Sequence, residues 1–363
     1  IGMVLAGGCA SGSLYKIGEG NGTSILAIIG ISFGQAIFVD LDGIFNKLVP
    51  QSWIDSALSK KWIPSGKITS WFDYFVAGNV FNKKMLTIAK TKFISSLFSN
   101  DVRYFVGDAF INTILPSVIL LALIYYFYPR KTFIRRRRGE RGSTGIGDEI
   151  AGIWNMITSS KRTSTMGILI GITAGLHILA MRGMQLKYGV NNFGQLLSSM
   201  GYTKDVSAIG KVFDPGYWYI TTQEAQFGAW ILEKFGWNMR DNVFFGVMNG
   251  IPQLWRNPAL WMSVGIVFGA MVMALLNNEF KFKLPKGELI VWGLGGGLLM
   301  GIGARVALGC NIGAFFIRVA GGDPGGWLFG IGMVVGAFVS VRFFNWWSER
   351  KMAKEMADFD IEF

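Results

Sequence analysis

The residues of this chain best placed to do chemistry are Cys9 and Cys310, which are its only two cysteines. Cys9 stands in "LAGGCASGSLYKIGEG" at 5–20, and Cys310 stands in "ARVALGCNIGAFFIRVAGG" at 304–322. When the cysteines are superposed, three pairs of glycines coincide: Gly8 with Gly309, Gly12 with Gly313, and Gly20 with Gly321. The chain therefore carries one Gly-Cys motif twice, near its two ends.

The residue types in this motif suit a small anion that contains sulfur or selenium. Glycines let the backbone approach a ligand closely. Broken helices direct free N–H groups, the positive end of the helix dipole, toward a pore. A thiol adds a weak donor and a soft, polarizable sulfur. The alternative is that the cysteines are small packing residues and that the glycines mark helix contacts.

Arg305 is a further candidate, because it lies in an apolar run five residues before Cys310. An arginine inside a membrane is costly and is a functional candidate by default, here as an attractor of anions. The alternative is a structural arginine that bonds helix-end carbonyls. The candidate substrate-binding residues are therefore Cys9, Cys310, Gly8, Gly12, Gly309, Gly313 and Arg305.

We expect no catalytic residues, metal or cofactor. One histidine, His177, and two cysteines cannot form a haem pair, a His-rich metal site or a four-ligand zinc site. The remaining composition points to a membrane. The chain has 363 residues, of which 51% are hydrophobic and 16% are charged, whereas soluble domains carry about 25% charged residues. We attribute the net charge of +12 to cytoplasmic loops and not to nucleic-acid binding.

Six apolar stretches approach the length of about 20 residues that a membrane-spanning helix needs. They are 23–39, 109–128, 163–181, 257–278, 288–304 and 324–347. The cysteine motifs themselves are too short and too rich in glycine for an ordinary span. We interpret them as re-entrant or interrupted helices, which a bilayer tolerates where they are buried in protein or line a cavity. The predicted fold class is an all-α integral membrane protein.

Loop charges give the predicted orientation. Three basic groups are expected to be cytoplasmic: the run 128–142, then Lys281, Lys283 and Lys286, then Arg350, Lys351 and Lys354. The helix at 23–39 then runs outward and the helix at 324–347 runs inward, although the same motif precedes both. This predicts an inverted repeat with the Gly-Cys motifs at its centre.

The predicted division places a first repeat at 1–142, with an outer insertion at 40–103. The second repeat covers 143–363, with an outer insertion at 183–242. Because Ile1 begins in the middle of an apolar, glycine-rich pattern, we expect the first repeat to lack an upstream segment.

The pair "GMVLAGGCASGSLYKIGEG" and "GIGARVALGCNIGAFFIRVAGGDPGGW" resembles the YeeE/YedE family of membrane proteins. The resemblance is strong over 2–39 and 258–347 and weak over the two outer insertions. It implies an hourglass-shaped inverted repeat whose central cysteines pass thiosulfate inward through S–H···S hydrogen bonds. By motif match, Cys9 and Cys310 take two of these roles. The family's third cysteine, in an upstream Phe-Cys motif, has no counterpart here.

The sequence thus predicts a multi-pass transporter in the bacterial cytoplasmic membrane that imports thiosulfate, with a TusA-like sulfurtransferase as a partner implied by the family. Three alternatives remain. One is a carrier of selenium compounds or sulfite. Another is a membrane thiol oxidoreductase, which needs the two cysteine Cα atoms within about 7 Å. The third is a structural scaffold.

Overall fold

The computed structural model describes residues 1–41, 113–141, 145–188, 220–241, 244–245, 250–307, 309–320 and 325–361. Within these ranges the regular structure is helical and falls into two compact units. Most of the predicted outer insertions 40–103 and 183–242 lies outside the described residues, so their placement stays a prediction. The division into repeats at residue 142 also stays a prediction.

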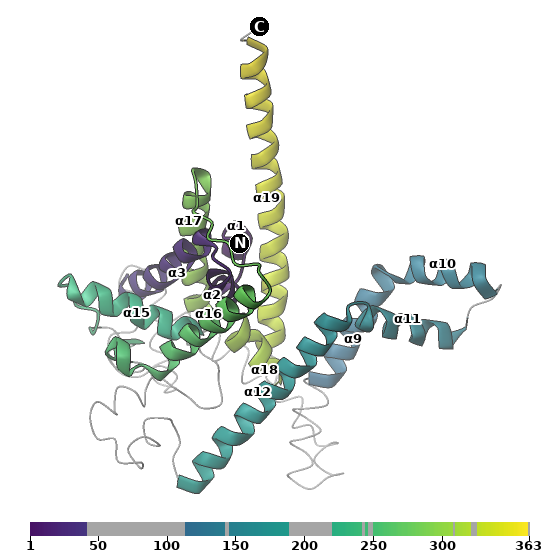
Figure 1. The fold of residues 1–363 in the computed structure, drawn as a ribbon, viewed down its shortest axis with the longest axis horizontal. Coiled ribbons are helices and arrows are strands. Elements are labelled where there is room, and N and C mark those ends of the chain that lie inside the picture. The colour runs from purple at the N-terminus through teal and green to yellow at the C-terminus, as the bar shows by residue number, and fades with distance from the viewer. Residues whose placement is uncertain are drawn as a thin grey trace, which may run out of the picture. The chain divides into compact units, whose positions relative to one another are not determined.

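The first unit contains both cysteine motifs. From the N-terminus it has α1 (Gly2–Leu5), α2 (Ala10–Gly18) and α3 (Gly22–Asp40), as Figure 1 shows. Its later part has α15 (Ile220–Lys234), η4 (Leu254–Arg256), α16 (Pro258–Leu276), α17 (Glu288–Val306), η5 (Asn311–Phe316), α18 (Ile317–Ala320) and α19 (Gly325–Ile361).

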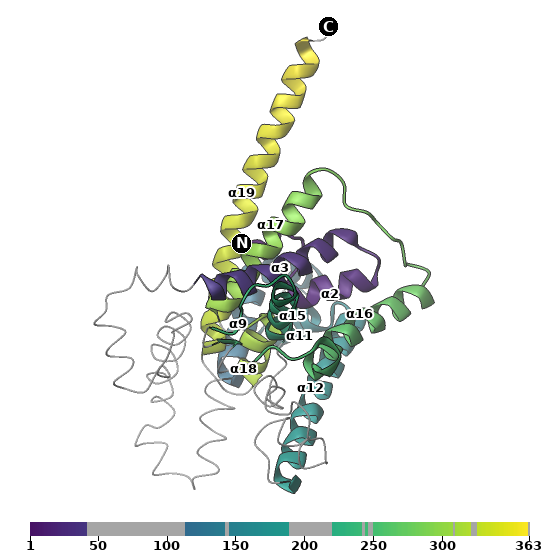
Figure 2. The same ribbon diagram turned by 90° about the vertical axis from the view of Figure 1, so that its left-hand side faces the viewer.

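Helices α3 and α17 form the closest helix pair of this unit, because glycines remove the side chains between them. A methyl group at Gly30 would lie 2.5 Å from the carbonyl oxygen of Leu294, and one at Gly34 would lie 2.8 Å from that of Leu298. These distances leave room for a hydrogen atom only. Because the contacts advance in the same direction along both helices, α3 and α17 run parallel (Figure 2).

Helix α19 runs antiparallel to α17. Near the start of α17, Glu288 forms an ion pair with Lys351 at 3.0 Å. Trp292 makes an edge-to-face contact with Trp347, with ring centroids 5.8 Å apart. Beyond the end of α17, Phe315 lies against Trp327. Since α3 is parallel to α17, the helices that follow the two motifs, α3 and α19, run in opposite directions. An inverted repeat requires this relation, although the repeat over the whole chain stays a prediction.

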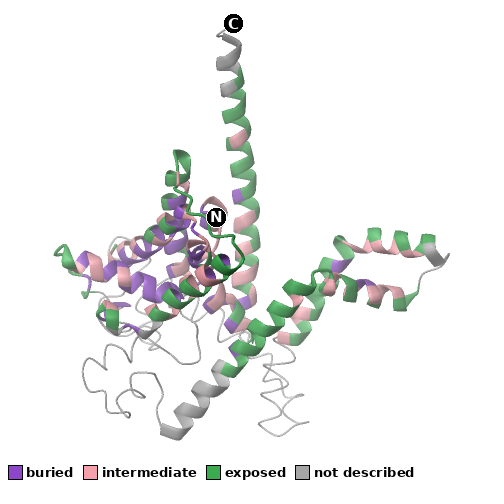
Figure 3. Cartoon of the chain, viewed as in Figure 1, coloured by how far each residue is buried: buried purple, intermediate pink, exposed green. Residues whose placement is uncertain are grey.

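Three helices of the described residues are long and apolar enough to cross a membrane: α3, α17 with its continuation to Ala320, and α19 as far as Ala353. They cover the predicted spans 23–39, 288–304 and 324–347. Helix α19 exposes most of its apolar surface (Figure 3), including Val334 at 70% and Ile331 at 62%. Such a surface needs lipid or protein to cover it. The predicted all-α membrane protein is confirmed.

The described parts of the other three predicted spans are helical, but they are not among the helices that are long and apolar enough to cross a membrane. The stretch 257–278 forms α16, whose part Leu260–Leu276 is a shorter apolar helix, and 109–128 contains the short apolar helix α9 (Leu115–Phe127). The stretch 163–181 lies within α12 (Lys161–Tyr188).

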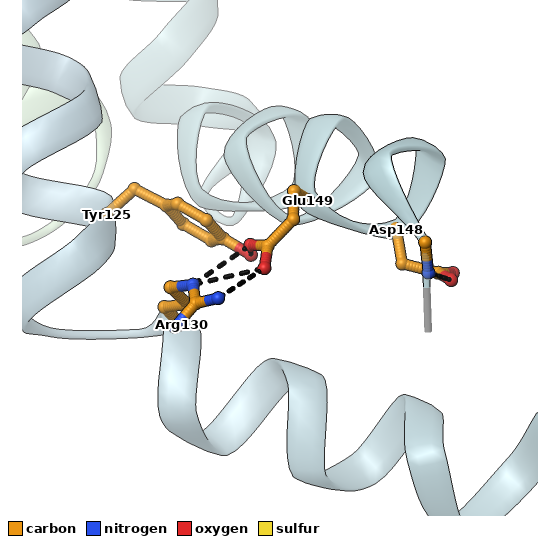
Figure 4. A network of polar contacts seen from close by, with 5 residues as sticks. Tyr125, Arg130, Asp148 and Glu149 are labelled. Carbon is orange, nitrogen blue, oxygen red and sulfur yellow. Dashed lines mark hydrogen bonds and ion pairs between the residues drawn. The ribbon is translucent and has the colours of Figure 1, made fainter. Parts of the chain in front are cut away.

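Helices α9 and α12 belong to the second unit, together with α10 (Arg130–Arg141) and α11 (Ile146–Thr158). Glu149 joins three of these helices (Figure 4). Its carboxylate accepts hydrogen bonds from the Arg130 guanidinium at 2.7 Å and from the Tyr125 hydroxyl at 2.9 Å. The Arg130 bond is the main cause that lowers the pKa of Glu149.

Candidate functional site

The first cysteine motif is a break between two short helices. Helix α1 ends at Leu5, the chain turns through Gly7 with φ of 74°, and α2 begins at Ala10. A positive φ of this kind favours glycine. Cys9 is the N-cap of α2, and its sulfur accepts a hydrogen bond from the backbone N–H of Gly12 at 3.3 Å. Gly12 is therefore part of the thiol's immediate surroundings.

The second motif repeats this backbone arrangement. Cys310 is the N-cap of η5 with φ −89° and ψ 179°, and Cys9 has φ −78° and ψ 174°. The N–H of Gly309 donates to Ala304 at 2.9 Å, as Gly8 donates to Met3 at 2.9 Å. The superposition of the motifs in sequence is thus matched by equivalent hydrogen bonds in the structure.

The two motifs differ in the helix that begins after the cysteine. After Cys9 the chain forms nine residues of α-helix, whereas after Cys310 it forms the six-residue π-helical segment η5. The Cys310 thiol makes no N-cap hydrogen bond. The backbone N–H groups of Ile312, Gly313 and Ile220 lie near its sulfur. Both cysteines are free thiols, and Cys310 is the more buried, with 5% of its surface exposed.

A cavity of about 370 Å³ lies where the two motifs meet, a volume within the range of small-molecule sites. Cys310 and Gly309 line it from the second motif, and Ala10, the residue after Cys9, lines it from the first. Ala6, Ala10 and Cys310 also pack in one apolar cluster. The structure therefore brings the two motifs together around one space.

Not every predicted residue reaches this space. Five of the predicted residues do not line the cavity: Gly8, Cys9, Gly12, Gly313 and Arg305. The guanidinium of Arg305 lies 3.9 Å from the ring centroid of Phe244, and the residue is only 6% exposed. Its charge is thus engaged by an aromatic face. The assignment of substrate contacts to all seven predicted residues stays a prediction.

The polar groups that do line the cavity come from residues outside the predicted set. They are Thr221 of α15, Asn311 of η5 and Arg318 of α18. The first motif also has a basic residue, since the Lys16 ammonium donates a hydrogen bond to the carbonyl oxygen of Gly7 in the break. Lys16 and Arg318 follow their cysteines by seven and eight residues. This similar spacing, about two helical turns, is the feature of the sequence that could have indicated Lys16 and Arg318.

The comparison with protein families identifies the chain. A family model described as "Sulphur transport" matches residues 1–78 and 63–339. The chain belongs to the sulphur transport family. The resemblance to YeeE/YedE proteins is confirmed by two curated relatives.

One relative of this sulphur transport protein is the thiosulfate transporter TsuA of Spirochaeta thermophila, which is 26% identical over 338 residues. That match covers 93% of this chain and 72% of the relative. Another is the probable transporter YedE of Escherichia coli, 30% identical over 130 residues, or 35% of this chain and 32% of YedE. The similarity to TsuA thus extends over nearly all of this chain, whereas the similarity to YedE is confined to about a third of it.

The sulphur transport protein also has a helix whose buried polar side chains the sequence analysis missed. Helix α15 lies in the stretch 183–242, yet it packs against α3, where a methyl group at Gly228 would be 2.5 Å from the Ser32 carbonyl oxygen. Five consecutive or nearly consecutive polar residues on it are buried: Thr221, Thr222, Gln223, Glu224 and Gln226. Through Thr221 this helix forms part of the cavity wall.

Proposed function

We propose that this chain is a multi-pass transporter of the bacterial cytoplasmic membrane that imports thiosulfate without changing it chemically. The observation that carries the proposal is the buried Cys310 thiol in the wall of a cavity that both motifs border. Membership of the sulphur transport family and similarity to a protein named as a thiosulfate transporter support the choice of anion.

The groups around the cavity suit the two ends of thiosulfate. The anion has three oxygens, which need hydrogen-bond donors or positive charge, and one terminal sulfur, which is larger and less tightly hydrated. Arg318, Thr221 and Asn311 supply donors for the oxygens. The Cys310 S–H supplies a weak, soft donor for the terminal sulfur.

The thiol also gives a physical basis for excluding sulfate. Sulfate presents an oxygen where thiosulfate presents its terminal sulfur, and a thiol is a poor replacement for the water that hydrates that oxygen. Much of the remaining wall is apolar, including Met300, Leu328 and Phe329. A preference of about 1.4 kcal/mol per cysteine corresponds to tenfold selectivity at each.

Cys9 is proposed as the second thiol of the path. It is less buried than Cys310, and the next residue, Ala10, lines the cavity. An anion passing between the two motifs exchanges one S–H···S contact for another. Lys16, at the first break, adds positive charge close to Cys9. As the family resemblance implies, the imported anion is then received by a TusA-like sulfurtransferase at the cytoplasmic face.

The test is uptake of labelled thiosulfate by proteoliposomes that contain the wild type, Cys9→Ser or Cys310→Ser. Ala274→Ser is the matched control, because it adds a hydroxyl at a residue that is equally buried, at 5%, and that lies outside the cavity. We expect each cysteine variant to lose about tenfold in thiosulfate uptake and to be inhibited more strongly by sulfate. The control should behave as the wild type.

Other outcomes would support the remaining candidates. Full thiosulfate uptake with unchanged sulfate exclusion in both variants would make the cysteines packing residues. Stronger competition by selenium anions or sulfite than by unlabelled thiosulfate would reassign the substrate. Formation of a Cys9–Cys310 disulfide during turnover would favour the thiol oxidoreductase.

A further inference from the structure

Helix α15 holds a carboxyl group that the transport path does not use. Glu224 is 2% exposed, and neither of its carboxylate oxygens has a hydrogen-bond partner among the described residues. Its neighbours on the helix do make side-chain hydrogen bonds. The Gln223 amide donates to the Ser263 hydroxyl at 3.1 Å, although its Oε1 has no partner among the described residues, and Gln226 accepts from Asn257 at 2.9 Å. A buried carboxylate without a partner is costly, so Glu224 needs a bound cation or a proton.

Among the described residues, no basic side chain lines the cavity that Glu224 borders. Glu224 lines a second cavity, of about 340 Å³, together with Ser32 of α3 and Ser263 of α16. The residues that line it from α2, α3 and α16 include no basic side chain.

A proton fits this cavity better than a metal ion does. Hard cations such as Ca²⁺ and Mg²⁺ take about six oxygen ligands, whereas Ser32 and Ser263 are the only other side chains with oxygen among the residues that line the cavity. Burial without a hydrogen-bond partner disfavours the charged form of this carboxyl. Glu224 therefore favours a bound proton.

Helix α15 connects this carboxyl to the anion cavity. Thr221 lines the Cys310 cavity, and Glu224, one helical turn later, lines the second cavity. A negative charge in the Cys310 cavity disfavours a second negative charge on Glu224. By reciprocity, the anion strengthens proton binding and the proton strengthens anion binding.

We propose that Glu224 is a proton-binding site that couples anion import to proton entry. Glu224 takes a proton from the outer side when the anion enters the Cys310 cavity, and it releases that proton to the inner side when the anion leaves. One proton therefore enters with each cycle at this site. The coupling rests on the proposed transport function, whereas the proton-binding site does not.

The first experiment measures coupling in proteoliposomes loaded with a pH-sensitive dye. In the wild type, an inward proton gradient of one pH unit should raise thiosulfate accumulation about tenfold per coupled proton, and the lumen should acidify during uptake. Glu224→Gln should retain exchange of labelled for unlabelled thiosulfate but lose both responses. The control is Glu233→Gln on the same helix, where the carboxylate pairs with Arg240 at 2.7 Å at the surface. It should keep both responses.

The second experiment detects the proton itself, with or without transport. Infrared difference spectra between alkaline and acidic buffer should show a protonated carboxyl band that shifts in D₂O. The band should be present in the wild type and Glu233→Gln and absent in Glu224→Gln. If Glu224→Gln does not fold, Glu224→Asp should shift the band instead.

The two experiments separate the possible failures. Wild type that exchanges no thiosulfate refutes the transport function, and the infrared band still decides whether Glu224 binds a proton. Thiosulfate uptake that ignores the proton gradient, or that follows a sodium gradient instead, overturns the coupling. If the wild type shows no titrating carboxyl band, or if Glu224→Gln keeps that band, Glu224 is not the proton-binding site.

Discussion

The two arginines near the second motif have different surroundings, and this difference separates their roles. Arg318 lines the Cys310 cavity, whereas Arg305 packs its guanidinium on Phe244. Arg305 was the predicted anion-binding arginine because it interrupts an apolar run of the sequence. Its helix neighbours Ala304 and Val306 do line the cavity, so the deciding fact is the direction of one side chain. Arg305 belongs to the regular helix α17, and the sequence alone does not show which face of that helix borders the cavity.

Arg318→Gln should therefore weaken anion binding while leaving the fold intact. Loss of a charge-assisted hydrogen bond of about 1.5–3 kcal/mol predicts a KM for thiosulfate uptake about tenfold higher or more. Arg318→Lys keeps the charge and should recover part of the affinity. Initial uptake rates across a concentration series, normalised to the amount of reconstituted protein, provide the measurement.

Arg305→Gln is the comparison variant. Because it removes a buried cation–π contact, we expect a lower melting temperature in detergent with a KM close to that of the wild type. The opposite pattern, a raised KM for Arg305→Gln and an unchanged KM for Arg318→Gln, would return the anion-binding role to Arg305.

The helices formed by the long apolar runs were predictable from the sequence. The runs at 23–39, 288–304 and 324–347 became α3, α17 and α19, because a long apolar run has few alternatives to a buried or lipid-covered helix. Helix α15 was missed because its Thr, Gln and Glu residues are typical of an exposed segment. It is buried through long-range contacts, such as the hydrogen bond of 2.8 Å from the Gln35 amide to the Thr221 carbonyl, which no local pattern reveals.

The parallel pair α3 and α17 gives a prediction at this scale. A methyl group at Gly301 would lie 2.5 Å from the Ile31 carbonyl oxygen, whereas one at Gly295 on the same helix meets no atom within 4 Å. Gly301→Val should separate the helices and destabilise the protein by at least the 1–3 kcal/mol typical of overpacking. Gly295→Val, which changes helix propensity in the same way, should change the melting temperature little. Equal melting temperatures for the two variants would contradict the observed packing.

Across the first unit, the directions of the helices agree with the loop charges. The ion pair between Lys351 and Glu288 places the basic segment after the apolar part of α19 at the same end as the start of α17. The loop that holds Lys283 ends at that point, and its backbone pairs with Gly20 at 2.8 Å. Two of the three basic groups assigned to the cytoplasm are therefore neighbours, as the positive-inside rule requires of them.

This arrangement predicts the orientation of the chain. In a background that carries Cys9→Ser and Cys310→Ser, a single cysteine at Lys283→Cys or Ser348→Cys should react with an impermeant maleimide only in inverted membrane vesicles. A cysteine at Ser52→Cys, in the predicted outer insertion, should react only in intact spheroplasts. Each variant is first labelled after solubilisation, which shows that its thiol is reactive.

The pair Lys283→Cys and Ser348→Cys tests more than orientation, because the two positions flank helices that run in opposite directions. In the predicted orientation, helix α17 runs outward after residue 283, and α19 returns to residue 348. Labelling from one side at both positions requires that the chain between them cross the membrane an even number of times. Labelling from opposite sides would mean that α17 and α19 do not both span the membrane.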